Sequence, residues 1–363
     1  MPNWPPVDRR KKSRDGSGDA MIEQAGGELV VLAPVLVGAW LLSMALIALL
    51  RPWLARRAMA RPNARSAHRV PTPQGGGLAV ITASFLVVGA AVALAPGLSP
   101  NEPGQLLGLA IATALLCAVG AVDDMRPLPQ LARLLAQCIA VGVVLAALPD
   151  DVRLLPQVPR WIERACLLLG GVWMVNLTNF MDGIDWMTVA EFVPVTATIA
   201  LVGWLGATDW LSALVAAALL GSVLGFAPFN RPTARLFLGD AGSLPLGLLL
   251  GWLLLQLAVA GHVVAAAILP LYYVADATIT LGRRLLRGEA VWQAHRSHFY
   301  QRAIDNGLTV RQIVGRVFLA NIALAALALI SIAGHGIVLS LMLPIIAGVA
   351  VAWPLVGFAR PRK

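Results

Sequence analysis

Three acidic clusters interrupt a sequence that is otherwise strongly apolar. Their aspartates are Asp123, Asp124, Asp182, Asp185 and Asp240. Apolar residues make up 58% of the chain and charged residues only 13%, so these carboxylates border stretches suited to lipid rather than to water. Ionisable side chains kept in such a setting indicate a functional site. Carboxylates there are suited to binding a divalent cation or to transferring a proton.

The longest cluster repeats a polar side chain every third residue, in the order Asn176, Asn179, Asp182 and Asp185. On a helix this spacing places the four side chains along one face. Gly183 within the repeat allows the backbone to turn or a ligand to approach it closely. Because four polar groups on one face of a membrane helix are costly without a ligand, the pattern favours a binding site.

The adjacent pair Asp123 and Asp124 ends an apolar run. Two neighbouring carboxylates can hold a divalent cation, or one can keep the other basic enough to accept a proton. The alternative is an ordinary helix end at the membrane surface. Arg133 follows at the start of the next apolar run. It is either an anchor whose side chain reaches the interface or a ligand for an anionic headgroup.

The segment Phe237–Ser243 opens another apolar run and carries glycines close to Asp240 on both sides. Backbone N–H groups at a helix N-terminus favour phosphate, and Asp240 could hold Mg²⁺ against that phosphate. Ser243 can cap the helix. The alternative interpretation is an N-terminal turn that binds no ligand.

A histidine pair, His295 and His298, flanks Arg296 within a basic stretch from 283 to 311. No cysteine or further histidine accompanies the pair, which argues against a structural zinc site. Histidine and arginine together are suited to binding a pyrophosphate. The alternative is a solvated basic loop that faces anionic lipids.

Two further acidic residues lie inside apolar runs. Asp276 is within two helical turns of Arg283, so a structural charge pair and a role in a site are equally compatible with its position. Glu191, near the inner end of another run, leaves the same two alternatives open.

The elements that must position these side chains are eleven apolar runs. Each is close to the roughly 20 residues that a helix needs to cross ~30 Å of hydrocarbon. Continuous apolar runs predict helices rather than a membrane barrel. We therefore predict an all-α, polytopic membrane protein with about eleven transmembrane helices, ten being the alternative because several runs nearly abut. The runs are residues 29–50, 76–96, 105–122, 131–149, 165–181, 187–206, 210–228, 242–260, 263–281, 313–333 and 337–357.

The distribution of arginine predicts the orientation in the membrane. With the N-terminus outside, the inside loops carry nearly all the loop arginines, whereas the outside loops carry only Arg153, Arg160 and Arg164. The C-terminus, the acidic clusters, the segment Pro71–Gly77 and the histidine pair then share the inside face. This asymmetry predicts an active site on the cytoplasmic face.

A basic N-terminal tail precedes the membrane domain. Residues 1–28 are predicted to be disordered, 29–357 to form one transmembrane domain, and 358–363 to be a cytoplasmic tail. The basic residues in 9–14 contradict the predicted orientation, because they would lie outside. One hypothesis is that translation starts at Met21. The formal charge of +9 is accounted for by the membrane interface, so no nucleic-acid partner is expected.

Carboxylates for a hard cation, donors for phosphates and a membrane setting together indicate phosphoryl transfer between a soluble nucleotide and a lipid. An ion-coupled transporter is the alternative of a different class, and it predicts acidic groups near mid-membrane and on both sides. Phosphatidyl transfer from a CDP-alcohol predicts an arginine shortly after the first Asp-Gly and further aspartates on one helix. Asp182-Gly183 is not followed by that pattern.

Five motifs in order resemble those of the polyprenyl-phosphate N-acetylhexosamine-1-phosphate transferases, glycosyltransferase family 4. The motifs are Pro-Thr-Pro-x-Gly-Gly-Gly, Asp-Asp, Asn-x-x-Asn-x-x-Asp-Gly-x-Asp, Phe-x-Gly-Asp-x-Gly-Ser and His-x-x-His, between about residues 60 and 310. The resemblance implies a bacterial inner-membrane enzyme with ten or eleven helices. The implied cofactor is Mg²⁺, with Mn²⁺ as the alternative metal. The implied reaction transfers an N-acetylhexosamine-1-phosphate from a UDP-sugar to undecaprenyl phosphate and releases UMP.

The sequence around His298 most resembles that of the subgroup that initiates O-antigen synthesis. The phospho-N-acetylmuramoyl-pentapeptide transferase branch, which has a triple histidine, is the alternative within the family. Cell-envelope polysaccharide synthesis is the implied pathway in the first case. The sugar and the oligomeric state, including a homodimer, are left open.

The resemblance also implies roles for individual residues. On the nucleotide side, Asp240 is implied as the principal Mg²⁺ ligand with Asn179 close to it, Phe237 as the surface that stacks on uracil, and Asp182 and Asp185 as carboxylates. On the lipid side, Asp123 or Asp124 is implied as the base on the lipid phosphate, and Arg133 as a contact of that phosphate. The residues His295, Arg296 and His298 are implied as a loop over sugar and diphosphate. The family usually has glycine after the last aspartate of its third motif, whereas this chain has Trp186. Here the tryptophan is expected to remove a flexible position and to offer a stacking surface beside the nucleotide.

Overall fold

The computed structural model describes residues 16–60, 71–94, 102–150, 152–290, 295–334 and 336–361. Within these ranges the protein is all-α apart from one pair of two-residue strands, which confirms the predicted fold class. The basic prefix in residues 9–14 lies outside the described residues. The prediction that residues 1–28 are disordered is wrong for residues 16–28, which already belong to the first helix.

Thirteen helices are formed by the described residues. They are α1 (Gly16–Arg57), α2 (Gly76–Leu94), α3 (Glu102–Met125), α4 (Gln130–Ala146), α5 (Arg160–Met181), α6 (Met187–Trp204), α7 (Trp210–Phe226), α8 (Asp240–Val259), α9 (Val263–Ile268), α10 (Leu271–Leu286), α11 (Phe299–Asp305), α12 (Val310–Ala333) and α13 (Ile337–Ala359). The strands β1 (Met59–Ala60) and β2 (Thr72–Pro73) pair antiparallel.

Seven stretches of the described helices are long and apolar enough to cross a membrane. They lie in α1, α2, α3, α6, α8, α12 and α13, while α4 and α7 are apolar but shorter. The chain is therefore a multi-pass membrane protein, and the count of eleven spans stays a prediction. Ten of the eleven predicted runs coincide with a single helix each. The run 263–281 is broken into α9 and α10 at Pro270, which lacks the N–H that a continuous helix needs.

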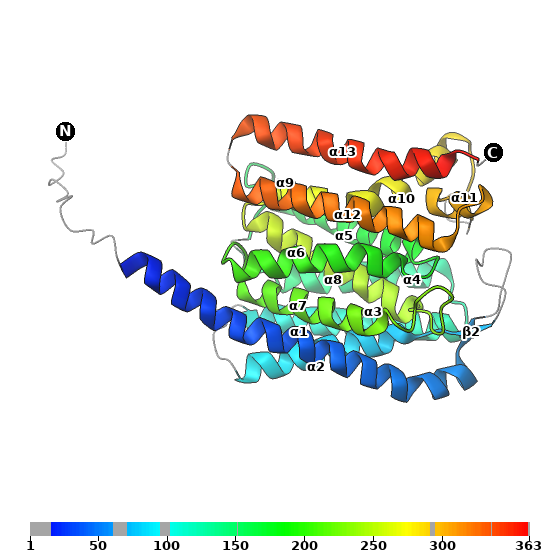
Figure 1. Ribbon diagram of the computed structural model, residues 1–363, viewed down its shortest axis with the longest axis horizontal. Coiled ribbons are helices and arrows are strands. Elements are labelled where there is room, and N and C mark those ends of the chain that lie inside the picture. The colour runs from blue at the N-terminus through cyan, green and yellow to red at the C-terminus, as the bar shows by residue number, and fades with distance from the viewer. Residues whose placement is uncertain are drawn as a thin grey trace.

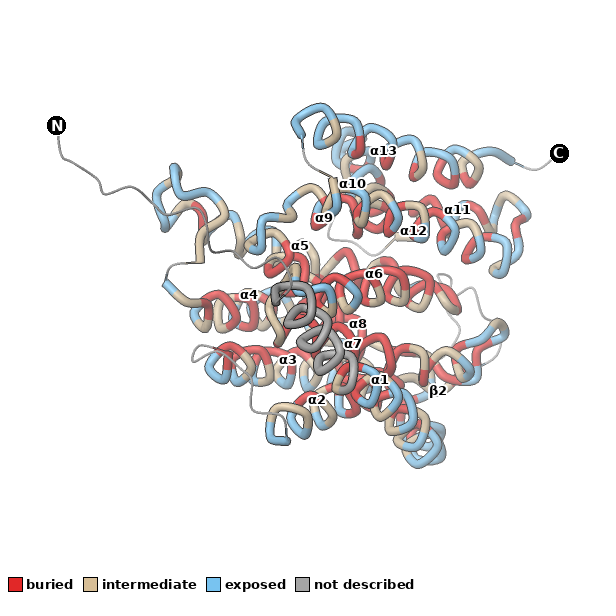
Figure 2. Tube along the Cα trace, turned by 60° about the vertical axis from the view of Figure 1, so that its left-hand side comes forward, coloured by how far each residue is buried: buried red, intermediate tan, exposed pale blue. Residues whose placement is uncertain are grey.

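Most of the helices lie side by side with their axes along a common direction (Figure 1). The centre of the bundle is formed by α7 and α8, whose side chains are buried almost throughout. By contrast, α13 leaves most of its residues exposed, and the burial colouring shows it along the outside (Figure 2). Helices buried all round and helices apolar on their outer face are the arrangement expected of a bundle in lipid.

A backbone contact joins the glycine-rich segment to the third acidic cluster at the end of the bundle that carries β2. Phe237 N–H donates to Pro73 O at 2.8 Å, and Gly76 N–H donates to Phe237 O at 2.9 Å. A Cβ atom on Gly77 would come within 2.0 Å of Gly242 Cα. Glycine is therefore required where α2 meets the beginning of α8, and the close approach fixes the start of α8.

Candidate active site

Two cavities meet at a wall formed by Asn179 and Asp240. The smaller has a volume of about 190 Å³ and is lined by Gln74, Asp124, Asn179, Asp182, Gly183, Ile184, Asn230, Phe237, Leu238, Gly239, Asp240 and Ser243. The larger, of about 650 Å³, is lined by Gln130, Arg133, Leu134, Gln137, Leu169, Val172, Trp173, Asn176, Asn179, Phe180, Asp240, Leu244, Leu281, His295, His298 and Gln301. We call them the polar cavity and the amphipathic cavity. All three acidic clusters and the histidine pair thus contribute to one region.

The wall itself is a small hydrogen-bond network at the beginning of α8. The Asn179 side-chain amide donates to Asp240 Oδ1 and to Ser243 Oγ, each at 2.8 Å. From the other side, the Arg133 guanidinium lies 3.5 Å from Asp240 Oδ2. Asn179 therefore orients Asp240 through its NH₂ group, and metal binding by its oxygen stays a prediction.

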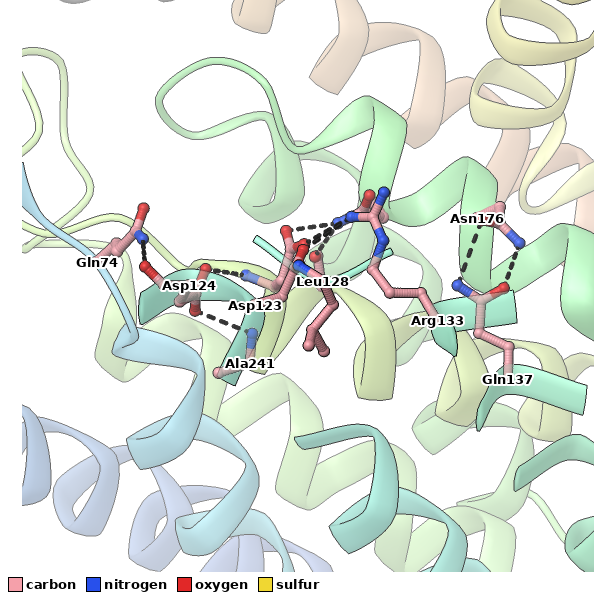
Figure 3. Close-up of polar contacts among 11 residues, drawn as sticks. Gln74, Asp123, Asp124, Leu128, Arg133, Gln137, Asn176 and Ala241 are labelled. Carbon is pink, nitrogen blue, oxygen red and sulfur yellow. Dashed lines mark hydrogen bonds and ion pairs between the residues drawn. The ribbon is translucent and has the colours of Figure 1, made fainter. Parts of the chain in front are cut away.

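Asp124 caps helix α8 from another helix. Its carboxylate accepts the backbone N–H groups of Asp240 at 2.9 Å and of Ala241 at 3.1 Å, as Figure 3 shows. Gln74 donates to the Asp124 backbone carbonyl at 2.6 Å. The expectation that these N–H groups would bind phosphate is wrong for this arrangement, because Asp124 already occupies them. Ser243 likewise does not cap α8, because it lies within the helix, whose N-cap residue is Gly239, and its hydroxyl accepts from Asn179.

Asp123 has different surroundings, although it is the adjacent residue. Its carboxylate accepts the Leu128 N–H at 2.5 Å and the Arg133 guanidinium at 2.8 Å. Arg133 therefore lies between Asp123 and Asp240. Figure 3 shows its contact with Asp123. The pair thus divides into one carboxylate that holds a helix and one that holds the arginine of the amphipathic cavity.

The three-residue repeat of the second cluster does not remain on one face. Helix α5 ends at Met181, and Asp182 follows as its C-cap residue. Asn176 lines the amphipathic cavity and Asp182 the polar cavity, with Asn179 in both. Asp185 lines neither cavity, because it is buried and its carboxylate accepts the Ala234 N–H at 2.9 Å. Its predicted contact with a nucleotide stays a prediction, and its visible role is to hold the loop before α8.

The carboxylate of Asp182 is the acidic group of the polar cavity that lies outside the helices. Removal from water raises the pKa of Asp182 to about 7, and the nearby carboxylates of Asp124 and Asp185 act in the same direction. A hydrogen bond from the Thr188 hydroxyl acts in the opposite direction. Asp182 therefore changes charge near neutral pH.

The histidine loop is held by Asp276, whose role the sequence left open. This fully buried carboxylate accepts the backbone N–H groups of Phe299 at 3.0 Å and of Tyr300 at 3.2 Å, which caps α11. It also lies 3.3 Å from His298 Nδ1. The rings of His295 and His298 stack with centroids 4.9 Å apart. Asp276 thereby orients His298 beside the amphipathic cavity, and no contact with Arg283 is needed.

The loop around the histidines is also fixed to the second acidic cluster. The Tyr300 hydroxyl donates to the Phe180 carbonyl at 2.9 Å. A Cβ atom on Gly183 would come within 2.0 Å of that hydroxyl, so this glycine admits the tyrosine. Arg296 lies outside both cavities and is 3.2 Å from Asp305. Its predicted contact with sugar or diphosphate stays a prediction.

The amide side chains of Gln137, Gln74 and Asn230 line the cavities but were not among the residues predicted from the sequence. Asn176 Nδ2 donates to Gln137 Oε1 at 2.6 Å, and both residues line the amphipathic cavity (Figure 3). Gln137 follows Arg133 by one helical turn in an apolar helix, which is the signal that could have indicated it. Gln74, in the polar cavity, was hidden inside the Pro-Thr-Pro-x-Gly motif.

Trp186 adopts the left-handed backbone conformation, with φ of 63°. This explains why glycine suits the position. The Trp186 N–H donates to Asn230 Oδ1 and its indole N–H to the Ala227 carbonyl, each at 2.7 Å. The side chain therefore packs against the loop after α7 and does not line the polar cavity, in contrast to the stacking surface expected from the sequence.

Glu191 has a structural partner within the bundle. Its Oε2 accepts the Asn321 side-chain amide at 2.8 Å, and both residues are buried. Neither lines the polar or the amphipathic cavity. Of the two alternatives that the sequence left open, the geometry favours the structural one.

Asp124, Asp182 and Asp240 are the carboxylates of the polar cavity that could bind a hard cation. Among the described residues, no three His, Cys, Asp or Glu side chains form a preassembled metal cluster. Mg²⁺ generally needs only one or two carboxylates together with substrate phosphates and water. Asp240, with the Asp124 and Asp182 side chains lining the same cavity, fits a site of that kind, which the substrate would complete.

The model of glycosyl transferase family 4 matches residues 106–258. That region includes two of the three acidic clusters and the beginning of α8. A decaprenyl-phosphate N-acetylglucosaminephosphotransferase of Mycobacterium leprae (strain TN) is 27% identical over 297 residues, covering 72% of this chain and 74% of the relative.

The chain is therefore similar to transferases of glycosyl transferase family 4. A second relative, from Bacillus subtilis (strain 168), is named as a probable undecaprenyl-phosphate N-acetylglucosaminyl 1-phosphate transferase and is 25% identical over 78% of the chain and 81% of the relative. A phospho-N-acetylmuramoyl-pentapeptide-transferase of Synechococcus sp. (strain JA-3-3Ab) is 33% identical over 58% of the chain and 64% of the relative.

Proposed function

We propose that this protein moves an N-acetylhexosamine-1-phosphate from a UDP-sugar to undecaprenyl phosphate and releases UMP. The observation that carries the proposal is the meeting of a polar and an amphipathic cavity at the Asn179–Asp240 wall. A reaction between a water-soluble and a membrane-bound substrate needs two such compartments with one shared boundary. The names of the relatives support the same reaction class.

The polar cavity is assigned to the nucleotide diphosphate. Phe237 offers an aromatic surface at its lining, which is suited to stacking on uracil. Asn230 and Gln74 supply amide groups that can bond to the base or the ribose. Asp182 contributes a carboxylate whose pKa lies near neutrality, so its protonation state responds to the ligand.

The amphipathic cavity is assigned to the lipid phosphate. Arg133, His295 and His298 lie at its polar part, where a phosphate would find charged and hydrogen-bonding donors. Leu134 and Trp173 belong to its apolar lining, on helices α4 and α5. Such a lining is suited to the first isoprene units of the lipid.

The chemistry proposed at the wall is a direct displacement. An oxygen of the lipid phosphate attacks the β-phosphorus, a new P–O bond forms, and the bond from that phosphorus to the bridging oxygen breaks with its electrons leaving on UMP. Mg²⁺, held by Asp240 and the diphosphate, would neutralise the charge of the leaving group.

The residues of the protein position the attack. A phosphate monoester is mostly dianionic at neutral pH, so the nucleophile needs placement more than deprotonation. Arg133 places it, and Asp123 holds Arg133. Of the two adjacent aspartates, Asp123 is the better candidate for any proton transfer, because both oxygens of Asp124 already bond to α8.

The proposal also covers the cellular location of the enzyme and the pathway of its product. The enzyme lies in the bacterial inner membrane with both cavities open to the cytoplasmic side, and its product initiates O-antigen or a related cell-envelope polysaccharide. The muramoyl-pentapeptide branch is the second candidate, because a relative at 33% identity carries that name. The single pair of histidines favours the first candidate.

The test is a substrate panel with purified full-length protein. Undecaprenyl phosphate and Mg²⁺ are incubated with UDP-N-acetylglucosamine, UDP-N-acetylgalactosamine or UDP-N-acetylmuramoyl-pentapeptide, and UMP release is measured. We expect release with one of the simple N-acetylhexosamines. Release with the pentapeptide substrate alone would select the second candidate, and release with none would contradict the proposed reaction.

A further inference from the structure

A third cavity lies apart from the proposed catalytic region. It has a volume of about 380 Å³ and lies between α6, α7 and α12, and none of its lining residues borders the polar or the amphipathic cavity. Its walls include Trp186 just before α6, Val189 and Val193 on α6, and Gly315 and Phe318 on α12. Apart from the Arg311 guanidinium, the lining is apolar in character. We call it the lateral groove.

Gly315 faces the open space of the lateral groove. A Cβ atom on Gly315 would meet no atom within 4 Å, so the α12 wall recedes at this position. Phe318, one turn further along, is 37% exposed, and Val189 and Val193 are half-buried. Because α6 and α12 are both membrane-spanning helices, the apolar walls of the groove lie at the depth of acyl chains.

The positive charge at the end of the groove is the Arg311 guanidinium, and no acidic side chain in the first turn of its helix balances it. Arg311 lies in the first turn of α12, which contains no acidic residue. The N-terminus of a helix carries partial positive charge, so a cation there is unfavourable and an anion is favourable. Arg311 is exposed and donates to the Pro232 carbonyl at 3.1 Å, and the neighbouring Arg231 is exposed as well.

We propose that the lateral groove binds an anionic glycerophospholipid from the surrounding membrane. An acyl chain lies along Val189, Val193 and Phe318, and the headgroup phosphate accepts from Arg311 at the beginning of α12. Anionic headgroups are attracted to arginines at the inner membrane surface, and a chain in an apolar groove removes further area from water.

The groove is connected to the proposed catalytic region by two hydrogen-bonded residues. Trp186 forms part of the groove wall and donates to Asn230, which lines the polar cavity. Asn230 in turn donates to the Leu236 carbonyl at 3.0 Å, just before Phe237. A lipid in the groove therefore supports the loop that carries the wall of the polar cavity.

The binding experiment is native mass spectrometry of the full-length protein in detergent. It is titrated with phosphatidylglycerol and, separately, with the zwitterionic phosphatidylethanolamine of the same chain length. Arg311→Gln removes the charge, and Gly315→Leu fills the groove. Gly348→Leu on α13 is the matched control, because its added Cβ atom also meets nothing within 4 Å and lies outside the groove.

We expect wild-type protein and Gly348→Leu to retain one phosphatidylglycerol in preference to phosphatidylethanolamine. Arg311→Gln should weaken that binding by about fivefold, the effect of one arginine near a membrane surface. Gly315→Leu should abolish the preferred adduct. Equal retention of the two lipids by wild-type protein, or unchanged retention in both groove variants, would overturn the proposal. So would displacement of phosphatidylglycerol by undecaprenyl phosphate, because the groove would then bind the substrate.

Discussion

Asp124 and Asp276 each bind the N-terminal N–H groups of a helix that lies elsewhere in the sequence. Asp124 accepts from the beginning of α8, and Asp276 from the beginning of α11. These helices carry Asp240 and follow His298, respectively. At the scale of the residue, these two aspartates therefore position the groups proposed to face the substrate.

Asp276→Asn tests this positioning role. Asparagine retains one oxygen but places an NH₂ group where the other was, so either Tyr300 N–H or the pair His298 and Phe299 N–H faces a donor instead of an acceptor. We expect kcat/KM for UMP release to fall at least about tenfold, the size typical of carboxylates that orient a functional histidine. Asp150→Asn, at an exposed loop position, is the control. Wild-type kcat/KM in Asp276→Asn would contradict the role.

The raised pKa of Asp182 predicts a pH-dependent stability. An unfolded aspartate releases its proton near pH ~4, whereas Asp182 in the folded protein releases it near pH 7. Between these values the folded state binds more protons than the unfolded state, so the free energy of unfolding decreases as pH rises through this window. Asp182→Asn should remove that part of the slope. Thermal unfolding in detergent between pH 5 and pH 8 measures it, and identical slopes in both proteins would refute the prediction.

The close contact of α2 with α8 is the decisive feature at the scale of the element. The backbones of Gly77 and Gly242 are in direct contact because neither residue has a side chain. Nearby backbone hydrogen bonds join Pro73 and Gly76 to Phe237. Because α8 begins with Asp240, the distance between these two helices sets the position of the proposed metal ligand. The glycine-rich motif is thus a packing requirement in this protein.

Gly77→Ala is expected to separate the two helices. Its Cβ atom would lie 2.0 Å from Gly242 Cα, and overpacking of this kind costs about 1–3 kcal/mol. We expect a lower thermal unfolding temperature and a loss of most UMP release. Gly89→Ala lies on the same helix, where the added atom meets nothing within 4 Å, and should leave both unchanged or slightly raise stability. Equal behaviour of the two variants would contradict the packing argument.

Hydropathy predicted the helices well because the energetics of lipid leave few alternatives to a continuous apolar helix. Even the break between α9 and α10 has a visible cause in Pro270. The short helix α11 was not predicted, because seven residues in a basic loop carry no apolar period. Its stability depends on Asp276, which is distant in sequence.

The candidate site was predicted in outline, because its motifs lie at helix ends that must share one face of the membrane. Which carboxylate faces a cavity could not be predicted. Asp123 and Asp124 are adjacent and chemically identical. Their hydrogen-bond partners differ because Asp124 accepts from Asp240, which is 116 residues away in the sequence. Likewise, Asp185 continues the spacing of Asn179 and Asp182 but follows the end of the helix, so it turns toward Ala234.

At the scale of the whole molecule, the polar and amphipathic cavities are lined by residues at the end of α3, the beginning of α4, the end of α5 and the beginning of α8. The outer helix α13 is exposed along much of its length (Figure 2), and its exposed side chains are largely apolar. The contacts between Gln74, Asp124 and Asp240 confirm that the acidic clusters gather at these cavities. Which side of the membrane the cavities face stays a prediction from the arginine distribution.

Labelling of single cysteines tests the predicted orientation. In a variant whose three native cysteines are replaced by serine, Asp150→Cys and Glu289→Cys place a thiol in exposed loops at positions predicted to lie outside and inside. A membrane-impermeant maleimide added to intact bacterial cells should label the first and should label the second only after permeabilisation. The reverse pattern would invert the orientation.

The central claim is that Asp240 lies where the two substrates meet, and UMP release by Asp240→Asn tests it most directly. Wild-type protein should release UMP only when undecaprenyl phosphate, the accepted UDP-sugar and Mg²⁺ are all present. Asp240→Asn should be slower by at least about a hundredfold, the scale for losing a group that stabilises transition-state charge, while Asp150→Asn keeps the wild-type rate. Release of UMP by folded Asp240→Asn at the wild-type rate would contradict the claim.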